Sequence, residues 1–289
     1  MLITALTQFA LIFYNQMRGI EAAQVGLAVS VGLVVNAVAE PLIGSWSDRT
    51  RSRLGRRHPF MFASILPVGL SFYALFNPPA GLGDTATLAW ICVSNVILLQ
   101  ALTGYRTPHL ALGGELSSDY LERTNVMNYN TIFLWAGDSI SWVPSFGWIF
   151  SATAHYANGA LDPSRWQAFA SVIGLTVATA MFASAWFTRA RIPFLPQPGA
   201  DAQGFGVATF FRNVGHALRN RNYVVMLLGY FFSAMMAGVR GGLWLYSATY
   251  FWRLSNYALS FFVIGSLIGY AVGARIVVPL HRRFDKRWT

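Results

Sequence analysis

The sequence predicts an all-α membrane protein with several spanning helices, and three observations carry this prediction. Hydrophobic residues make up 55% of the 289 residues and only 11% are charged, whereas about 25% of the residues of a soluble domain are charged. The apolar residues form eight segments of near-spanning length. The cations, all arginine except for Lys286, gather between those segments. So few charges cannot cover a soluble protein of this size, which excludes a soluble enzyme.

A helix that crosses a bilayer needs about 20 mostly apolar residues. The first candidate segment is short and has no basic leader before it, so we expect residues to be missing before Met1. The eight predicted segments are 2–17, 25–46, 60–76, 87–112, 126–153, 166–188, 223–250 and 257–280.

The arginines alternate between the loops. Five lie in the loop 47–59, none in 77–86, and five again in 189–222. Because arginine-rich loops stay on the cytoplasmic side of a membrane, we expect the first and third of these loops inside and the second outside. The protein is then a multi-pass protein of the cell (inner) membrane with a cytoplasmic N-terminus.

A long linker divides the predicted helices. The predicted order is six helices, then a linker, then further helices. This is the order found in proteins built from two six-helix halves. We therefore expect a first bundle at 1–188, a cytoplasmic linker at 189–222 and the first two helices of a second bundle at 223–289, so that the chain is a fragment cut after its eighth helix. Part of the linker is either a solvated charged loop or, as we favour, an interfacial amphipathic helix with Phe210, Phe211, Val214 and Leu218 on one side.

Three stretches carry a family resemblance. Residues 40–60 read EPLIGSWSDRTRSRLGRRHPF, residues 108–124 read PHLALGGELSSDYLERT, and residues 240–250 read RGGLWLYSATY. The first resembles the loop between helices two and three of the major facilitator superfamily. Its form is that of the glycoside–pentoside–hexuronide:cation symporters, the melibiose permease relatives, and it is similar to that of sucrose carriers. The other two are similar to the fourth-to-fifth-helix region and the seventh helix of the symporter family.

The resemblance implies a major facilitator fold and a biochemical function. The chain would hold the N-terminal six-helix bundle and the first two helices of the second one. The protein would move a sugar or glycoside together with a cation by alternating access, as a monomer in the bilayer. Its partners would be the small-molecule substrate and the lipid, and no cofactor is expected beyond the co-transported H⁺ or Na⁺.

The first stretch also predicts a gating network. A glycine lets another helix approach closely, and Asp48 can pair with an arginine across the turn at Gly55. Such a cluster can lock two bundles together and release them; the alternative is that the arginines only set orientation and the nearby acids form a solvated loop. The predicted network comprises Gly44, Asp48, Arg49, Gly55, Arg56, Arg57, Glu115, Asp119, Glu122 and Arg123.

Charges inside the bilayer are the candidates for coupling, because one charge at a helix centre costs roughly 2.5–3.5 kcal/mol. Glu40 lies in the second segment, with Asn36 one turn before it on the same face. The resemblance implies two acids at these positions that hold the cation. A single carboxyl suits a proton better than Na⁺, so we favour proton coupling. The alternative is that Glu40 is a capping or interface acid.

A substrate cavity is predicted from polar and aromatic residues within the apolar segments. Arg106 can bind an anionic substrate or form a structural pair with Asp138, and Tyr14 can contact sugar or anchor a helix at the membrane surface. The predicted cavity residues are Tyr14, Asn15, Arg106, His109, Asn130, Trp135, Asp138 and Arg240.

Other functional classes lack their sequence signals. The single Cys92 excludes an internal disulfide and a thiolate metal cage. No nucleotide-binding loop, histidine pair with metal spacing or nucleophile–base pair is visible, so neither an enzyme nor a metal site is predicted. The loop arginines explain the net charge of +10 without nucleic acid. Two alternatives stay open: a carrier of lysolipids or other amphiphiles, and a non-transporting membrane assembly factor.

Overall fold

The computed structural model describes residues 2–116, 120–151, 153, 156, 159–195, 212 and 215–255, with single positions between 258 and 272. Within these residues every regular element is a helix. The long helices are α1 (Leu2–Ile12), α2 (Ala22–Arg49), α3 (His58–Leu75), α4 (Asp84–Glu115), α5 (Tyr120–Pro144), α6 (Arg165–Thr188) and α8 (Arg221–Tyr246). The short ones are the π-helical turns η1 (Phe13–Met17), η2 (Ser145–Ile149) and η5 (Ser247–Phe251) and the 3-10 turns η3 (Gly159–Leu161) and η4 (Arg189–Phe194).

These helices confirm the predicted all-α membrane fold. Five are long and apolar enough to cross a membrane, namely Ala22–Arg49, His58–Leu75, Asp84–Glu115, Arg165–Phe194 and Arg221–Phe251. The protein is therefore a multi-pass membrane protein. Helices α2 and α4 run beyond the predicted 25–46 and 87–112, because their polar ends continue the helix past the apolar centre. Most of the predicted segment 257–280 lies outside the described residues, as do Phe210, Phe211 and Val214 of the predicted amphipathic helix.

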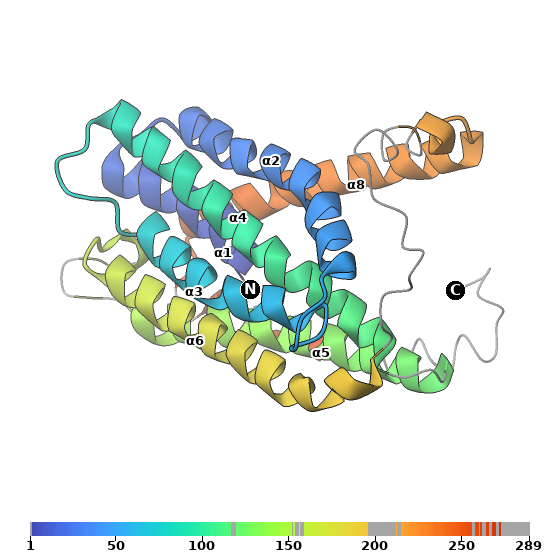
Figure 1. Cartoon of the computed structure of the whole chain (residues 1–289). Coiled ribbons are helices and arrows are strands. Elements are labelled where there is room, and N and C mark those ends of the chain that lie inside the picture. Colours follow the sequence, from blue (N-terminus) through green and yellow to red (C-terminus); the bar gives the residue numbers. More distant parts are fainter. Residues whose placement is uncertain are drawn as a thin grey trace.

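Close packing of small residues positions the bundle. Helix α4 packs against both α2 and α3, and α6 packs against α3 (Figure 1). At Gly32 a β-carbon would lie 2.2 Å from Nδ2 of Asn95, whose amide donates to the carbonyl of Val29 at 2.8 Å. A larger residue here would displace the Asn95 amide from this hydrogen bond, so glycine allows the close approach of α2 and α4 that is usual for helices that associate in membranes.

An aromatic cluster joins α1 and α6 to the end of α3. The rings of Phe9 and Phe169 lie 4.8 Å apart, those of Phe150 and Trp166 lie 4.9 Å apart, and Phe76 stacks on Trp166 at 5.5 Å. All five side chains are buried. Because these rings come from segments far apart in the sequence, their packing holds the first and sixth helices of the bundle together.

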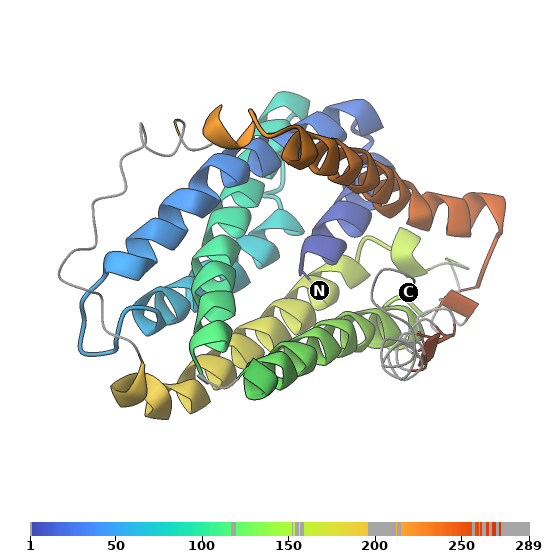
Figure 2. The same ribbon diagram turned by 90° about the vertical axis from the view of Figure 1, so that its right-hand side faces the viewer.

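Helix α8 contacts the bundle mainly through its last turns. Leu245 and Ala248 are buried there, whereas Phe231 and Met236, farther from this end, are exposed. Figure 2 shows α8 running along the outside of the first six helices. Its packing partner is α1, so the described link between the two parts of the chain is a contact between the first helix and the helix that follows the linker.

Candidate functional site

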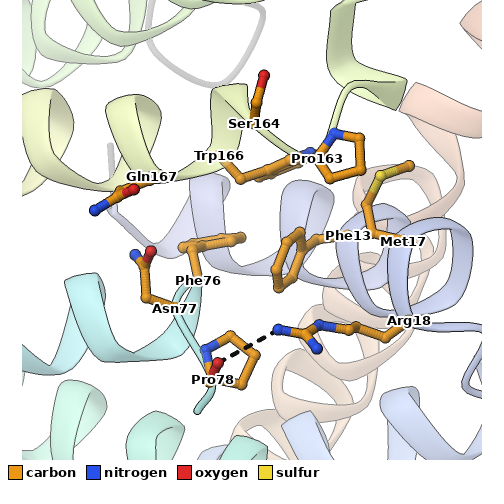
Figure 3. A pocket seen from close by; sticks show the side chains of 10 residues that line it. All are labelled: Phe13, Met17, Arg18, Phe76, Asn77, Pro78, Pro163, Ser164, Trp166 and Gln167. Carbon is orange, nitrogen blue, oxygen red and sulfur yellow. Dashed lines mark hydrogen bonds between the residues drawn. The ribbon is translucent and has the colours of Figure 1, made fainter. Parts of the chain in front are cut away.

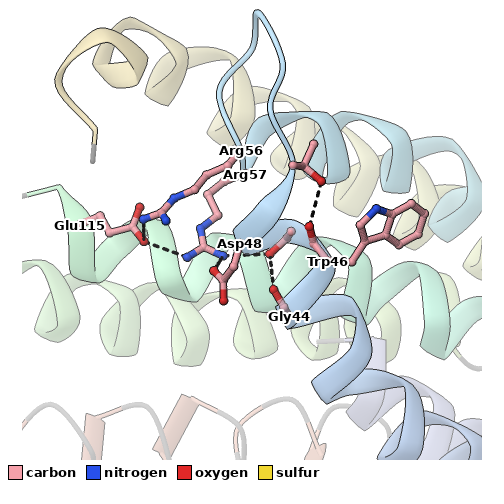
Figure 4. Close-up of polar contacts among 8 residues, drawn as sticks. Gly44, Trp46, Asp48, Arg56, Arg57 and Glu115 are labelled. Atoms are coloured by element: carbon pink, nitrogen blue, oxygen red, sulfur yellow. Dashed lines mark hydrogen bonds and ion pairs between the residues drawn. The ribbon is translucent and has the colours of Figure 1, made fainter. Parts of the chain in front are cut away.

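Where α2 and α4 end and α3 begins, four charged residues form a cluster that we call the arginine end: Asp48, Arg56, Arg57 and Glu115 (Figure 4). Oε1 of Glu115 lies 2.8 Å from Nη2 of Arg56 and 2.9 Å from Nη2 of Arg57. Nη1 of Arg57 pairs with Oδ1 of Asp48 and donates to Oγ of Ser47 at 2.9 Å. The cluster thus connects the ends of α2 and α4 to the start of α3.

The inner part of the arginine end is buried and incompletely paired. Only 6% of the Arg57 side chain and 16% of the Glu115 side chain is exposed, against 53% for Asp48. Within the described residues, Nε of Arg56, Nε of Arg57 and Oε2 of Glu115 are buried without a hydrogen-bond partner. Since buried polar atoms are rarely left unpaired, the cluster can take up a further donor and acceptor.

Two glycines of the predicted network have identifiable roles. Gly55 has φ +71°, in the left-handed region that other residues rarely adopt, and its N–H donates to the Ser52 carbonyl at 3.0 Å. A β-carbon there would lie 3.2 Å from Cγ2 of Ile192 in η4, so this turn packs against the start of the linker. At Gly44 a β-carbon would lie 3.3 Å from Cγ2 of Thr107, which brings α2 close to α4.

The remaining network residues lie around the cluster. Arg49 is half-buried in the last turn of α2, and Glu122 is exposed in the first turn of α5. Asp119 and the side chain of Arg123 lie outside the described residues. The gating role of the whole set stays a prediction.

The two coupling candidates occupy adjacent turns of α2. Oδ1 of Asn36 accepts a hydrogen bond from Oγ1 of Thr103 on α4 at 2.7 Å, so the packing of α4 fixes this amide. Glu40, one turn later, is exposed. The Asn36 oxygen already has a partner, and Glu40 supplies the carboxyl at this level of the helix.

At the opposite end of α2, uncharged hydrogen bonds join α1 to α8. We call this set the tyrosine end: Asn15, Gln16, Tyr246 and Tyr250. The Tyr246 hydroxyl donates to Oδ1 of Asn15 at 2.9 Å, and the Tyr250 hydroxyl donates to Oε1 of Gln16 at 2.8 Å. Three of the four residues lie in π-helical turns, η1 and η5, which frequently occur at functional sites. Asn15, a predicted sugar contact, thus contacts the other part of the chain.

Sequence reasoning did not find the tyrosine end. Tyr246 and Tyr250 were noted only as part of a family motif, although their spacing of four places them on one face of a helix. Their partners, Asn15 and Gln16, are more than two hundred residues away in the sequence. Tyr14 is buried and donates to the carbonyl of Leu75, which makes it a packing residue in this structure.

A pocket of about 370 Å³ lies beside the aromatic cluster (Figure 3). Its walls include Phe13, Phe76 and Trp166, and Arg18 also lines it, with Nη2 donating to the carbonyl of Pro78 at 3.3 Å. Arg18 was not singled out from the sequence. Buried rings form one part of the pocket, and the hydrogen bond of Arg18 joins the end of η1 to the loop after α3.

A larger pocket of about 740 Å³ lies between α4, α5 and α6. Two predicted cavity residues, His109 and Asn130, line it. Nε2 of His109 lies 3.1 Å from Oγ of Ser184, and its ring stacks on Tyr105 at 5.4 Å. Ser184 was missed from the sequence because a serine in an apolar helix has many structural roles.

The structure does not bring the other predicted cavity residues into this pocket. Arg106 is exposed on α4 and Arg240 is exposed on α8. The side chains of Trp135 and Asp138 lie outside the described residues, so the predicted pairing of Arg106 with Asp138 stays a prediction.

Comparisons with known proteins give the family. The family described as MFS/sugar transport protein matches residues 1–289. The inner membrane symporter YicJ of Escherichia coli is 24% identical over 91% of this chain and 55% of its own length. The putative glycoside/cation symporter YagG of the same organism is 26% identical over 95% of the chain and 56% of its own length. An uncharacterized symporter of Synechocystis, sll1374, is 33% identical over 46% of the chain and 25% of its own length.

The match to the family covers the whole chain, and the chain spans about half the length of the two Escherichia coli relatives. These relatives are named as symporters rather than as enzymes. The helical fold, the five spanning helices and the family match agree with the resemblance of the loop between α2 and α3. The chain belongs to the MFS/sugar transport proteins, the branch of the major facilitator superfamily that includes glycoside/cation symporters.

Proposed function

We propose that the protein carrying this chain is a cation-coupled symporter that moves a sugar or glycoside across the inner membrane by alternating access. The name of YagG, a glycoside/cation symporter, supports this substrate class. Residues 1–188 form the first bundle, 189–222 the cytoplasmic linker, and 223–289 belong to the second bundle. The protein acts as a monomer.

The observation that carries this proposal is the different bonding at the two ends of α2. The arginine end connects α2, α3 and α4, which all belong to the proposed first bundle. The tyrosine end connects α1 of the first bundle to α8 of the second. Alternating access by rocking bundles requires rigid bundles with breakable contacts between them, and this division of bonds suits that motion.

The coupling ion is a proton, and Glu40 carries it. Asn36 is a neutral amide whose oxygen accepts a hydrogen bond from Thr103, so Glu40 is the carboxyl that serves this part of α2. A Na⁺ ion needs several oxygen ligands, whereas a proton needs one carboxyl. Sugar contacts come from Arg106 and Asp138 in the first bundle and from Arg240 in the second, with Trp135 stacking on the sugar ring.

Uptake in proteoliposomes tests this function. A labelled glycoside should accumulate when a pH gradient is imposed and not when a Na⁺ gradient is imposed. Glu40→Gln should abolish accumulation, while Glu21→Gln, a matched change of an exposed acid just before α2, should leave it unchanged. Accumulation driven by Na⁺ without any dependence on pH would overturn the coupling proposal. Absence of glycoside uptake under both gradients would overturn the substrate class.

The orientation follows from the arginines and has its own test. We propose that the arginine end and the linker face the cytoplasm, with 77–86 outside. Ser52→Cys in a Cys92→Ser background should resist an impermeant thiol reagent added to intact cells, and Ala80→Cys should react. Labelling of position 52 from outside would reverse the orientation.

A further inference from the structure

We propose that the pocket between α4, α5 and α6 binds a single-chain amphiphile with a small hydrogen-bonding head group, such as a long-chain fatty acid, at a site separate from the sugar path. The pocket of about 740 Å³ falls within the range of roughly 300–1,000 Å³ that small-molecule sites occupy. Its walls come from the second half of α4, the first half of α5 and the last turns of α6.

The lining of the pocket suits an acyl chain and not a sugar. Most of it is aliphatic or aromatic, and among the described residues that line it there is no acid, arginine or lysine. A sugar in such a pocket would leave most of its hydroxyls without partners, at a cost of about 1–3 kcal/mol for each buried group. An acyl chain meets no such cost. The apolar wall residues include Leu112, Val126, Met127, Phe133, Leu134 and Met181.

The rim of the pocket is apolar as well. Leu110, Phe133 and Leu134 line it, and these residues are 50%, 72% and 55% exposed. In a spanning protein, exposed apolar residues on helices face lipid or a neighbouring helix. Where this rim faces lipid, a ligand with an acyl chain can reach the pocket from within the bilayer.

A few polar groups gather in this apolar wall and provide a place for a head group. His109 is held by Ser184 at 3.1 Å and by stacking on Tyr105, so its ring is fixed in direction. Asn130 lines the same pocket, and its amide has no hydrogen-bond partner within the described part of the chain. The imidazole and the amide are each able to hydrogen-bond a carboxyl or hydroxyl group.

Photolabelling with a diazirine-bearing palmitic acid tests the site in the full-length protein in nanodiscs. Labelled peptides should map to α4 after Tyr105, to α5 between Val126 and Gly137, and to the end of α6. Ala180→Trp fills the pocket and should reduce this labelling about tenfold, the change that 1.4 kcal/mol in affinity produces. Ala168→Trp is the matched control, because Ala168 is an exposed alanine earlier on the same helix that does not line the pocket.

A second variant tests the head group. His109→Leu should lower labelling by the palmitic acid probe. Palmitic acid methyl ester, which lacks the free acid, should bind the unmodified protein and His109→Leu equally weakly. Thermal unfolding of each variant shows that it is folded. The proposal is overturned by labelling spread evenly over all helices, by labelling that folded Ala180→Trp leaves unchanged, or by displacement of the probe by excess glycoside.

The source of the amphiphile is resolved by vesicle experiments. A probe that crosses into vesicles under a gradient is cargo, and a probe that stays bound is a component of the bilayer. Both results place an amphiphile in this pocket. If the protein does not transport glycoside but is still labelled by the palmitic acid probe, only the proposed sugar function is contradicted. The proposed function and the proposed amphiphile site therefore fail separately.

Discussion

The two ends of the helix bundle are bonded by different chemistry. At the arginine end, ion pairs centred on the buried Arg57 connect three helices of the same bundle, and one carboxylate oxygen of Glu115 receives two guanidinium groups. At the tyrosine end, neutral hydroxyl–amide hydrogen bonds connect α1 to α8. Breaking a buried ion pair costs about 3–5 kcal/mol, whereas a neutral hydrogen bond contributes about 0.5–1.5 kcal/mol. The stronger interactions thus lie within the first bundle, and the weaker ones join α1 of that bundle to α8.

The described contacts of the arginine end lie within one bundle. From the sequence we expected the cluster to lock two bundles together. The partners that the structure describes lie at the ends of α2 and α4 and in the loop that leads into α3, so these contacts join elements of one bundle. The unpaired buried atoms of Arg56, Arg57 and Glu115 keep the expected contact with a second bundle open as a prediction.

The largest expected effect concerns Glu40. Glu40→Gln cannot take up and release a proton, so accumulation against a gradient should vanish while downhill exchange of substrate continues. Uptake and exchange are measured separately in proteoliposomes. Glu40 lies on α2 between the arginine end and the tyrosine end. Unchanged accumulation in Glu40→Gln would therefore show that the proton does not act on either end through this residue of α2.

The next largest effect should come from the arginine end. Glu115→Gln leaves Arg56 and Arg57 without their shared carboxylate, and we expect a loss of about 3–5 kcal/mol in the stability of the bundle. Thermal unfolding of the purified protein measures it. Glu21→Gln removes an exposed acid and serves as the control. Equal melting temperatures for the unmodified protein, Glu115→Gln and Glu21→Gln would contradict a stabilising role of the ionic cluster.

Asp48→Asn should act on the rate of transport rather than on stability. About half of the Asp48 side chain is exposed, so the solvent weakens its pair with Arg57. We expect slower uptake with nearly unchanged substrate affinity, because Asp48 lies away from the proposed sugar contacts. Loss of binding in a folded protein would contradict this role.

The smallest effect should come from the tyrosine end. Tyr246→Phe removes the hydrogen bond to Asn15, which is worth about 1 kcal/mol, and favours the state in which α1 and α8 separate. In a Cys92→Ser background, Leu11→Cys should then react faster with a thiol reagent. Tyr230→Phe, an exposed tyrosine earlier on α8, is the control. Faster reaction in both variants would show that the effect is not specific to this contact.

The sequence was sufficient to predict the helices but not their pairing. Spanning segments are recognisable because the bilayer demands long apolar runs, and the arginine end because Gly55 and its neighbouring charges lie within one short loop. The tyrosine end joins residues at the two extremes of the described chain, and no local pattern links Asn15 to Tyr246. For the same reason the contact of His109 with Ser184 was not predicted, since it depends on how α6 lies against α4.

The turn at Gly55 has a mechanical consequence. It packs against Ile192 at the start of the linker, and nearby Nε2 of His58 lies 3.1 Å from Oγ1 of Thr188 at the end of α6. The first residues of the linker are thus held against the same loop that carries Arg56 and Arg57. A movement of that loop would therefore also displace the point at which the linker begins.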